Sequence, residues 1–498
     1  MKLDASTPPI GTVGDWLKAR AQAGGVAIVF PETESVLSWA DLRADATAFA
    51  RHLTSKGAAK CESIAIIAPN SREAVVAFYG VLVGGFRATM INLAAGRDAI
   101  SYALEHSEAR FAYVHDDCFS LFEDANSGNV ERVGFEGDSE AELHNVNASD
   151  HALLMYTSGT TGKPKGVVHT HASLLAGGWT TAIAHELSPS DRGFCVLPIY
   201  HINGLCVTVI GSLVSGGSLA MTGKFSTSRF WEQASEAKVT WFSVVPTIIS
   251  HLLHGEEEPD EACRARLRFG RSASSALAVE TQSGFETRFS VPIIETMGLT
   301  ETAAQILSNP LPPALRKIGS PGYGFGCQVQ VQDSKGEQLP ANSEGEIVVC
   351  GPNVMLEYLR NPEATESTFR DGWLRTGDLA KMDDDGYVFV TGRLKELIIK
   401  GGENIAPREI DEVLYTHPDV VEAAAFARQS ARYGETVEAA VRIRFGSEIG
   451  EKELMELCVS GLGKFKSPDL IHFIDELPKG PSGKIQRLKL AELLPSKS

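Results

Sequence analysis

A run of small hydroxyl residues, glycines and lysines at residues 156–167 is the part of the sequence best suited to hold an anion. It reads Tyr-Thr-Ser-Gly-Thr-Thr-Gly-Lys-Pro-Lys-Gly-Val. Small residues let backbone N–H groups approach a phosphate closely, while hydroxyl groups add donors and lysines add positive charge. A flexible surface loop would account for the glycines alone. We therefore expect a phosphate site made by Thr157, Ser158, Gly159, Thr160, Thr161, Gly162, Lys163 and Lys165.

This segment differs from the phosphate loop of the P-loop NTPases. In that loop a serine or threonine follows the Gly-Lys pair, whereas Pro164 follows Gly162 and Lys163 here. The loop also requires a glycine five residues before Gly162, and that position holds Thr157. The sequence therefore disfavours a P-loop NTPase.

The elements around the phosphate segment follow a strand–helix–strand order. Residues 151–155 are expected to form a strand before the segment, with a helix after it. Residues 63–69, 72–82 and 88–92 predict a buried strand, a helix capped by Asn70 or Ser71, and a second strand. Further strands are expected at residues 193–197, 239–245 and 291–295. This order predicts an α/β fold of parallel-type sheets flanked by helices.

The texture changes after about residue 315, where short strands and tight turns predominate. Strands are expected at residues 328–332, 345–350 and 386–390. The run Asp383-Asp-Asp-Gly386 lacks the alternating ligand spacing of an EF-hand loop, so we expect a hairpin turn there. A boundary near residue 393 divides the chain into two predicted domains, 1–393 and 394–498.

Bulk properties restrict the function classes. The net charge of −17 argues against binding nucleic acid or an anionic membrane surface, except through a local basic pocket. The eight cysteines form no CxxC pair, so we expect free thiols and no zinc site. The uncharged run 204–221 contains four glycines and predicts a buried helix followed by a strand, not a membrane span. With no apolar signal at the N-terminus, we expect a cytoplasmic protein.

The segment 156–167 resembles the signature of the adenylate-forming superfamily, which comprises acyl-CoA synthetases, firefly-type luciferases and peptide-synthetase adenylation domains. Further motifs of the superfamily follow in the same order, from about residue 60 to residue 490. The resemblance implies an acid–CoA ligase that uses ATP, Mg²⁺ and CoA and forms an acyl-adenylate, AMP and pyrophosphate. It also implies a large N-terminal domain with a small barrel-like β region, and a small mobile α+β C-terminal domain.

Two further motifs resemble those that hold ATP in the superfamily. In Met297-Gly-Leu-Thr-Glu301 the resemblance makes Thr300 a donor to the α-phosphate and Glu301 the ligand of Mg²⁺. Met297 replaces the usual aromatic residue against adenine, which a thioether can still contact. Asp378, in Trp373-Leu-Arg-Thr-Gly-Asp378, would accept both ribose hydroxyls. The remaining ATP contacts implied are Ser274, Gly298 and Arg393.

The C-terminal motifs resemble those that change the site between two half-reactions. Lys395 occupies the hinge position, and Lys484, in Pro478-Lys-Gly-Pro-Ser-Gly-Lys484, matches the adenylation lysine. The residues that the resemblance places along the pantetheine and CoA path are Lys400, Gly401, Gly402, Lys464, Phe465 and Lys466. Lys464 or Lys466 would meet the nucleotide phosphate of CoA, because Ser467 stands where some relatives have arginine.

The segments 271–277 and 308–312 resemble the oxalate–CoA ligase branch. His201 matches the family histidine that borders the acid pocket, which the resemblance builds from His201, Asn203, Ser272, Ser275 and Ala304. In that branch histidines are expected at the position of Asn203 and near Ala304, and both are absent here, so the acid need not be oxalate itself. The resemblance implies a small acid that can be dianionic, oxalate-like or sulfoacetate-like. A short-chain, medium-chain or aromatic acid is the alternative.

Other functions of the superfamily differ in the step after adenylation. A luciferase-like monooxygenase would use oxygen instead of CoA, and the motifs alone leave that alternative open. A peptide-synthetase module would be followed by a carrier domain, and the sequence ends at Ser498 soon after the terminal motif. The expected partners are thus ATP, CoA and a small carboxylic acid, with no nucleic acid, membrane span or carrier protein, and the chain is expected to be a monomer or homodimer.

Overall fold

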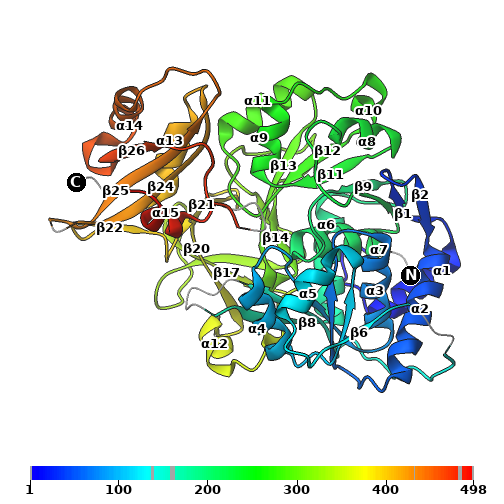
Figure 1. The fold of residues 1–498 in the computed structure, drawn as a ribbon. Helices are drawn as coiled ribbons and strands as arrows, with labels where there is room; N and C mark the ends of the chain where they lie inside the picture. The colour runs from blue at the N-terminus through cyan, green and yellow to red at the C-terminus, as the bar shows by residue number, and fades with distance from the viewer. Residues whose placement is uncertain (1–2, 136–138, 158–162, 431, 481–484, 496–498) are drawn as a thin grey trace.

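The computed structural model describes residues 3–135, 139–157, 163–430, 432–480 and 485–495 (Figure 1). Within these ranges, no helix combines the length and the apolar character that crossing a membrane requires. Strands from residue 398 onward form a sheet of their own, and these strands and their helices gather to one side of the molecule, orange to red in Figure 1. We refer to residues 394–498 as the C-terminal part.

The largest sheet has nine strands, in the order β15-β14-β13-β12-β11-β9-β10-β1-β2. Its central strands, from β13 to β1, are parallel, and the strands beyond them at both ends are antiparallel. Their bounds are β1 Val26–Phe30, β2 Ser35–Ser38, β9 Arg192–Cys195, β10 Ser218–Met221, β11 Trp241–Val244, β12 Phe269–Ser272, β13 Ile293–Leu299, β14 Ala304–Ser308 and β15 Tyr323–Gly324.

A second sheet has seven strands, in the order β18-β8-β7-β4-β3-β5-β6. Its bounds are β3 Ser63–Ile67, β4 Arg87–Met90, β5 Phe111–Val114, β6 Glu131–Val133, β7 His151–Thr157, β8 Lys165–Thr170 and β18 Glu357–Tyr358. Strands β7 and β8 are antiparallel, so the phosphate segment joins two strands of a hairpin. The expectation of a helix directly after this segment was wrong, because residues 165–170 pair with β7 before helix α6 begins.

Two smaller sheets complete the fold. The antiparallel sheet β16-β17-β20-β19, with β21 paired to β20, is the expected region of short strands after residue 315. Its bounds are β16 Gln328–Gln332, β17 Glu344–Cys350, β19 Phe369–Arg370, β20 Trp373–Met382 and β21 Val388–Arg393. The sheet of the C-terminal part comprises β22 Ile398–Lys400, β23 Glu403–Ile405, β24 Val420–Ser430, β25 Gly434–Ile443 and β26 Leu470–Phe473.

Helices cover these sheets. In the first half of the chain they are α1 Val13–Ala23, α2 Trp39–Ser55, α3 Arg72–Val83, α4 Arg97–Ser107, η1 Asp116–Cys118, α5 Phe119–Ala125, α6 His171–Ala184, η2 Asn203–Ile210 and α7 Gly211–Ser215. The others are α8 Phe230–Glu236, α9 Pro246–His254, α10 Glu261–Arg266, α11 Val279–Phe289, η3 Thr300–Thr302, α12 Pro362–Thr368, α13 Pro407–Tyr415, α14 Glu451–Lys466 and α15 Arg487–Leu493.

Local predictions were confirmed where the sequence pattern was strong. Ser71, one of the two predicted caps of α3, accepts a hydrogen bond from the backbone N–H of Ala74. The run 204–221 forms buried helix and then β10, but its first turns, η2, wind as a π-helix. Asp383 lies in a hairpin turn, where its carboxylate accepts from the N–H groups of Asp385 and Tyr387. All eight cysteines are free thiols.

Candidate nucleotide and acid site

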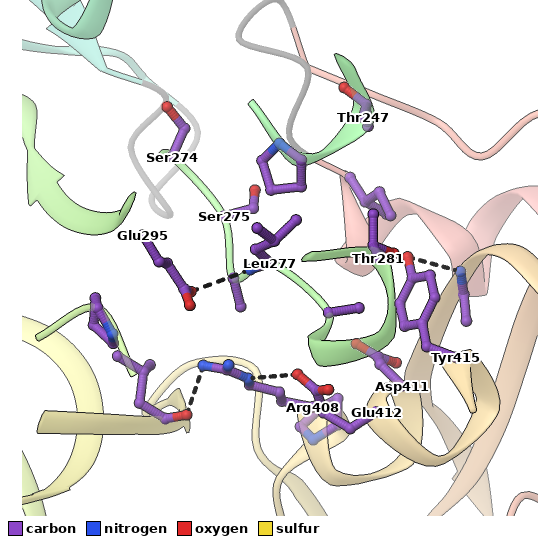
Figure 2. Close-up of a pocket in the computed structure, with 18 of the residues that line it drawn as sticks. Thr247, Ser274, Ser275, Leu277, Thr281, Glu295, Arg408, Asp411, Glu412 and Tyr415 are labelled. Carbon is purple, nitrogen blue, oxygen red and sulfur yellow. Dashed lines mark hydrogen bonds and ion pairs between the residues drawn. The ribbon is translucent and has the colours of Figure 1, made fainter. Parts of the chain in front are cut away.

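A cavity of about 220 Å³ lies between the carboxyl ends of β12 and β13 and the C-terminal part (Figure 2). In open α/β sheets, ligands commonly bind just beyond the carboxyl ends of the parallel strands. The predicted site residues that line this cavity are Ser274, Ser275, Met297, Gly298, Asp378 and Arg393. The C-terminal part contributes helix α13 and the start of α15, including Arg408, Asp411, Glu412, Ile485 and Arg487. The fold thus brings residues distant in sequence to one cavity.

Asp378 and Arg393 form a close ion pair at the cavity wall. The Nε of Arg393 lies 2.6 Å from Oδ1 of Asp378, and Asp378 is only 3% exposed. The two residues are directly opposite each other in the β20–β21 hairpin. This pairing holds the Asp378 carboxylate in a fixed orientation, which would favour two parallel hydrogen bonds to a diol.

Thr300 and Glu301 stand in η3, directly after β13, and neighbouring side chains hold both. The backbone oxygen of Thr300 accepts a 2.7 Å hydrogen bond from Nε2 of His169, whose Nδ1 accepts from Ser173. Burial lowers the pKa of His169 to about 4, so the ring is neutral at pH 7 and can donate on one side and accept on the other. The carboxylate of Glu301 accepts a 2.8 Å hydrogen bond from the hydroxyl of Tyr358.

Tyr358 lies between the phosphate segment and Glu301, because it contacts Lys165 with its ring and Glu301 with its hydroxyl. The ammonium of Lys165 lies 4.6 Å from the centre of the Tyr358 ring, and Lys163 lies 5.9 Å from that of Tyr102. The described residues contain no group of three or more ligands that would hold a metal ion alone. A single carboxylate such as Glu301 suits Mg²⁺, which commonly binds through one or two carboxylates, waters and substrate phosphates.

Glu295 is a buried carboxylate that the sequence analysis missed. It lines the cavity at 2% exposure, and its Oε1 accepts a 3.2 Å hydrogen bond from the N–H of Leu277. Burial raises the pKa of Glu295 to about 7, and Arg408 opposes this rise. Figure 2 shows Arg408 extending toward the side of the cavity on which Glu295 lies. Glu295 therefore adds a buried carboxyl group to the wall between the two parts of the chain.

The predicted acid-pocket residue Asn203 connects a buried arginine to the cavity. Its Oδ1 accepts a 2.7 Å hydrogen bond from Arg271, and its Nδ2 donates to Oγ of Ser274 at 3.2 Å. Arg271 is 1% exposed and also donates to Ser243 and to Gln305. Sequence analysis had treated Arg271 only as part of a branch signature.

The other predicted acid-pocket residues surround this network. Ser272 is buried next to Arg271 on β12, and its carbonyl accepts from the hydroxyl of Thr296. Ala304 is buried at the start of β14, with φ of 82°, directly before Gln305. Left-handed backbone at a residue other than glycine is strained and concentrates at functional sites. The ring of His201 packs edge-on against Tyr200, with centroids 4.9 Å apart.

The predicted CoA-path residues cluster around β22. Gly401 and Gly402 form the turn between β22 and β23, with φ of 60° and 89°. The ammonium of Lys400 lies 5.5 Å from the ring centre of Phe465, while Lys466 pairs with Glu409. Lys464 is exposed on α14, and the predicted hinge residue Lys395 lies in the exposed turn between β21 and β22. Ser158, Gly159, Thr160, Thr161, Gly162 and Lys484 lie outside the described residues.

The residues that sequence analysis missed had only weak local signals. Arg271 itself gave one such signal: it is a charged residue in a short buried strand, and a buried charge needs a partner. His169 and Tyr358 showed none, since a histidine or a tyrosine in a strand is common in any fold. Their roles depend on contacts with segments more than 50 residues away.

Two family models match most of the chain. The model of the AMP-binding enzymes matches residues 16–359. The model of the AMP-binding enzyme C-terminal domain matches residues 409–484. These two ranges contain β12, β13 and most of α13, whereas the β20–β21 hairpin with Asp378 and Arg393 lies between them.

The sequence is 41% identical to a sulfoacetate–CoA ligase of Cupriavidus necator over 479 residues, which cover 93% of this chain and 94% of the relative. It is 34% identical to an oxalate–CoA ligase of Arabidopsis thaliana, over 89% of this chain and 91% of the relative. The structure resembles that of o-succinylbenzoate CoA synthetase from Bacillus subtilis in complex with ATP and magnesium, with a TM-score of 0.84 at 29% identity, over 95% of this chain and 98% of that chain.

Proposed function

The chain belongs to the AMP-binding enzymes, and within that family we propose that it joins a small dianionic carboxylic acid to CoA. Its reaction class is that of the AMP-forming acid–CoA ligases, which use ATP and Mg²⁺ and pass through an acyl-adenylate. The observation that carries the proposal is that both parts of the chain line one cavity. It is lined by Ser274, Met297 and Asp378 from one side and by Ile485 from the segment that bears the predicted adenylation lysine.

In the first half-reaction the carboxylate of the acid attacks the α-phosphorus of ATP, and pyrophosphate leaves. Both reactants are anions, so the site must neutralise charge. Lys163 and Lys165 would contribute positive charge, Thr300 a hydroxyl donor, and Asp378 would orient the ribose. Glu301 would hold Mg²⁺, which when bound supplies further neutralisation of the phosphates.

In the second half-reaction the thiol of CoA attacks the carbonyl of the adenylate, and AMP leaves. Ile485 and Arg487 line the cavity in this structure, whereas the Gly401–Gly402 turn is absent from its described lining. Ile485 directly follows the predicted adenylation lysine in the sequence, and its place on the cavity supports the proposal that this arrangement serves adenylation. We propose that residues 394–498 then rotate about Lys395, which brings the glycine turn to the cavity for thioester formation.

The acid we propose is small and carries a second anionic group, as sulfoacetate and oxalate do. The support comes from the residue pattern 271–277 and from the similarity to ligases named for these acids. Asn203 and Ala304 replace the histidines expected in an oxalate enzyme, so we favour sulfoacetate over oxalate. The acceptor is free CoA without a carrier protein, the location cytoplasmic, and the assembly a monomer or homodimer.

A panel of acids tests this proposal directly. CoA-dependent AMP release would be measured with sulfoacetate, oxalate, malonate, butyrate and benzoate at equal concentrations. We expect kcat/KM to be highest for sulfoacetate and at least about tenfold lower for butyrate and benzoate, because an unmet charged partner costs at least that much. Highest activity with butyrate or benzoate would contradict the proposed substrate, and absence of AMP release with every acid would contradict the proposed function.

A further inference from the structure

Glu422 is a buried carboxylate of the C-terminal part that pairs with two cations. It lies on β24 at 2% exposure and also lines the cavity. Its Oε2 lies 2.9 Å from Nε of Arg442, and its Oε1 lies 2.7 Å from Nζ of Lys479. Arg442 is directly opposite Glu422 on β25, so the register of the two strands accounts for that pair. Lys479 lies outside the strands of the sheet, and its pairing with Glu422 needs another explanation.

Lys479 stands where the chain enters residues 480–484, the segment that ends with the predicted adenylation lysine. Lys479 and Ile485 form an isolated antiparallel bridge, and the N–H of Gln486 donates to the carbonyl of Pro478 at 2.7 Å. The residue that precedes the segment and the residue that follows it are therefore neighbours in space. A group that holds Lys479 in place thus also fixes one end of the segment.

Two different ion pairs attach the two ends of this segment to the C-terminal part. On the entering side, the Lys479 side chain is 18% exposed and pairs with Glu422. On the returning side, Arg487 pairs with Asp411 at 2.6 Å, and Ile485 packs against an apolar cluster with side chains from β24 and α15. These two elements lie side by side in the C-terminal part (Figure 1). Both ion pairs are largely shielded from water, so salt screens them less than it screens surface pairs.

A lysine that stabilises developing charge must arrive at a defined position. Fixed ends restrict the conformations of a short loop, which lowers the entropy cost of ordering it. The pair of Glu422 and Lys479 lies wholly within the C-terminal part, so it would move with that part in the rotation that we propose about Lys395. Its loss would therefore displace Lys484 and leave the Gly401–Gly402 turn as it is.

We infer that Glu422 is a positioning residue for adenylation: through its ion pair with Lys479 it fixes the entering end of the segment that carries Lys484. Arg442 holds the same carboxylate in place from the neighbouring strand. The inference rests on the proposed function and deepens it, because it gives a buried carboxylate of the cavity wall the task of directing the predicted adenylation lysine. In this role Glu422 acts through Lys479 and contacts neither the acid nor ATP.

The test measures the two half-reactions separately, with the acid of the panel that gives the highest AMP release. ATP–pyrophosphate exchange reports adenylation, and thioester formation from the supplied adenylate of that acid reports the second step. In Glu422→Gln and in Lys479→Met we expect kcat for exchange to fall at least about tenfold, because a displacement of about 1 Å can lower a rate about 100-fold. We expect KM for ATP and the rate of thioester formation to be nearly unchanged, since Lys484 acts only while pyrophosphate is leaving.

A double variant and a matched control separate this role from a structural one. Glu422→Gln combined with Lys479→Met should lose little more exchange activity than either single variant, because all three lack the same pair. Glu438→Gln is the control: Glu438 is 3% exposed on β25 and pairs with Arg428 at 2.9 Å. We expect a lower Tm for Glu438→Gln, as for Glu422→Gln, but the wild-type ratio of the two half-reactions. If Glu422→Gln does not fold, Lys479→Met decides, since it leaves Glu422 paired with Arg442.

Three outcomes overturn the inference. An unchanged exchange rate in folded Lys479→Met would show that the entering end needs no attachment. Equal losses in both half-reactions would assign the pair a structural role only, and strictly additive losses in the double variant would show that the two residues act independently. Each of these leaves the acid–CoA ligase proposal intact, whereas a wild type that shows no exchange with any acid of the panel would contradict that proposal as well.

Discussion

At the scale of single residues, neighbouring side chains hold three of the proposed site residues in place before substrate arrives. Asp378 is oriented by Arg393, Thr300 by His169, and Glu301 by Tyr358. Preorganised groups of this kind avoid reorganisation during the reaction, which is the usual source of electrostatic stabilisation in enzymes. Predictions at this scale therefore concern individual side chains.

Lys484→Ala is expected to stop adenylation and to spare the second half-reaction. The ammonium of Lys484 would contact the carboxylate and the phosphate only while pyrophosphate is leaving, and loss of one such group typically lowers the rate about 10²–10³-fold. ATP–pyrophosphate exchange and thioester formation from supplied acyl-AMP would be measured separately. Lys489→Ala, on the exposed face of α15, is the control. Unchanged pyrophosphate exchange in Lys484→Ala would refute the assignment.

Glu295→Gln is expected to change how stability depends on pH. Burial raises the pKa of Glu295 from 4.5 to about 7 in the folded protein, so the folded state holds this proton more tightly than the unfolded state. The contribution to the free energy of unfolding is present below about pH 4.5 and is lost as the pH rises through 7, by about 3 kcal/mol. We expect Tm of the wild type to fall more than that of Glu295→Gln between pH 5 and pH 8.

Glu280→Gln is the control for this comparison, because Glu280 is exposed on α11. Its Tm should follow the wild type at both pH values. Parallel Tm profiles for Glu295→Gln and the wild type would mean that the carboxylate of Glu295 is ionised in the folded protein across this range.

At the scale of elements, a contact between α15 and α13 fixes the start of α15, close in sequence to the predicted adenylation lysine. Arg487 begins α15, and its Nη2 lies 2.6 Å from Oδ2 of Asp411 on α13. The same guanidinium donates to the carbonyl of Ala425 on β24 and lies 3.4 Å from Glu396. One side chain thus links a helix, a strand and the turn that contains Lys395.

Arg487→Gln is expected to lower stability by about 3–5 kcal/mol, because it leaves the buried Asp411 carboxylate without its partner. We also expect adenylation to be slower, since the adjoining segment loses its attachment. The double variant Asp411→Asn with Arg487→Gln should recover part of the lost stability, as expected for a coupled pair. Thermal unfolding and pyrophosphate exchange measure both effects, and strictly additive losses would argue against coupling.

At the scale of the whole molecule, the cavity exists only where the C-terminal part meets the rest of the chain. Glu295, Met297 and Asp378 come from one side, and Arg408 and Glu412 from the other (Figure 2). The exposed turn at Lys395 is the connection between the β20–β21 hairpin and the sheet of the C-terminal part. The rotation that we propose at this turn would replace one wall of the cavity and leave the proposed nucleotide-binding residues Met297 and Asp378 in place.

Lys395→Pro is expected to slow thioester formation at least about tenfold more than adenylation. Proline restricts φ to about −65°, which limits the rotation that we propose at this turn. Lys395→Ala is the matched control, because it removes the side chain without restricting the backbone. Single-turnover rates for the two half-reactions provide the measurement, and equal losses in both would argue against a hinge at Lys395.

The sequence by itself determined most local elements and the reaction class. Buried strands, helix caps and turns follow from the order of neighbouring residues, as at Ser71 and Asp383. The motifs at 297–301 and 373–378 were recognisable because each is continuous in the chain, and the structure places Met297 and Asp378 on one cavity.

Only the tertiary structure decided which side chains from distant segments meet. The pairing of β8 with β7, the contact of His169 with Thr300 across 131 residues, and that of Arg271 with Asn203 across 68 depend on sheet order and register. Burial also decided the proton equilibria, since the same carboxyl group titrates normally in water and near neutrality at Glu295. Neither spatial proximity nor exclusion of water is a property of a linear sequence, because both are created when the elements pack.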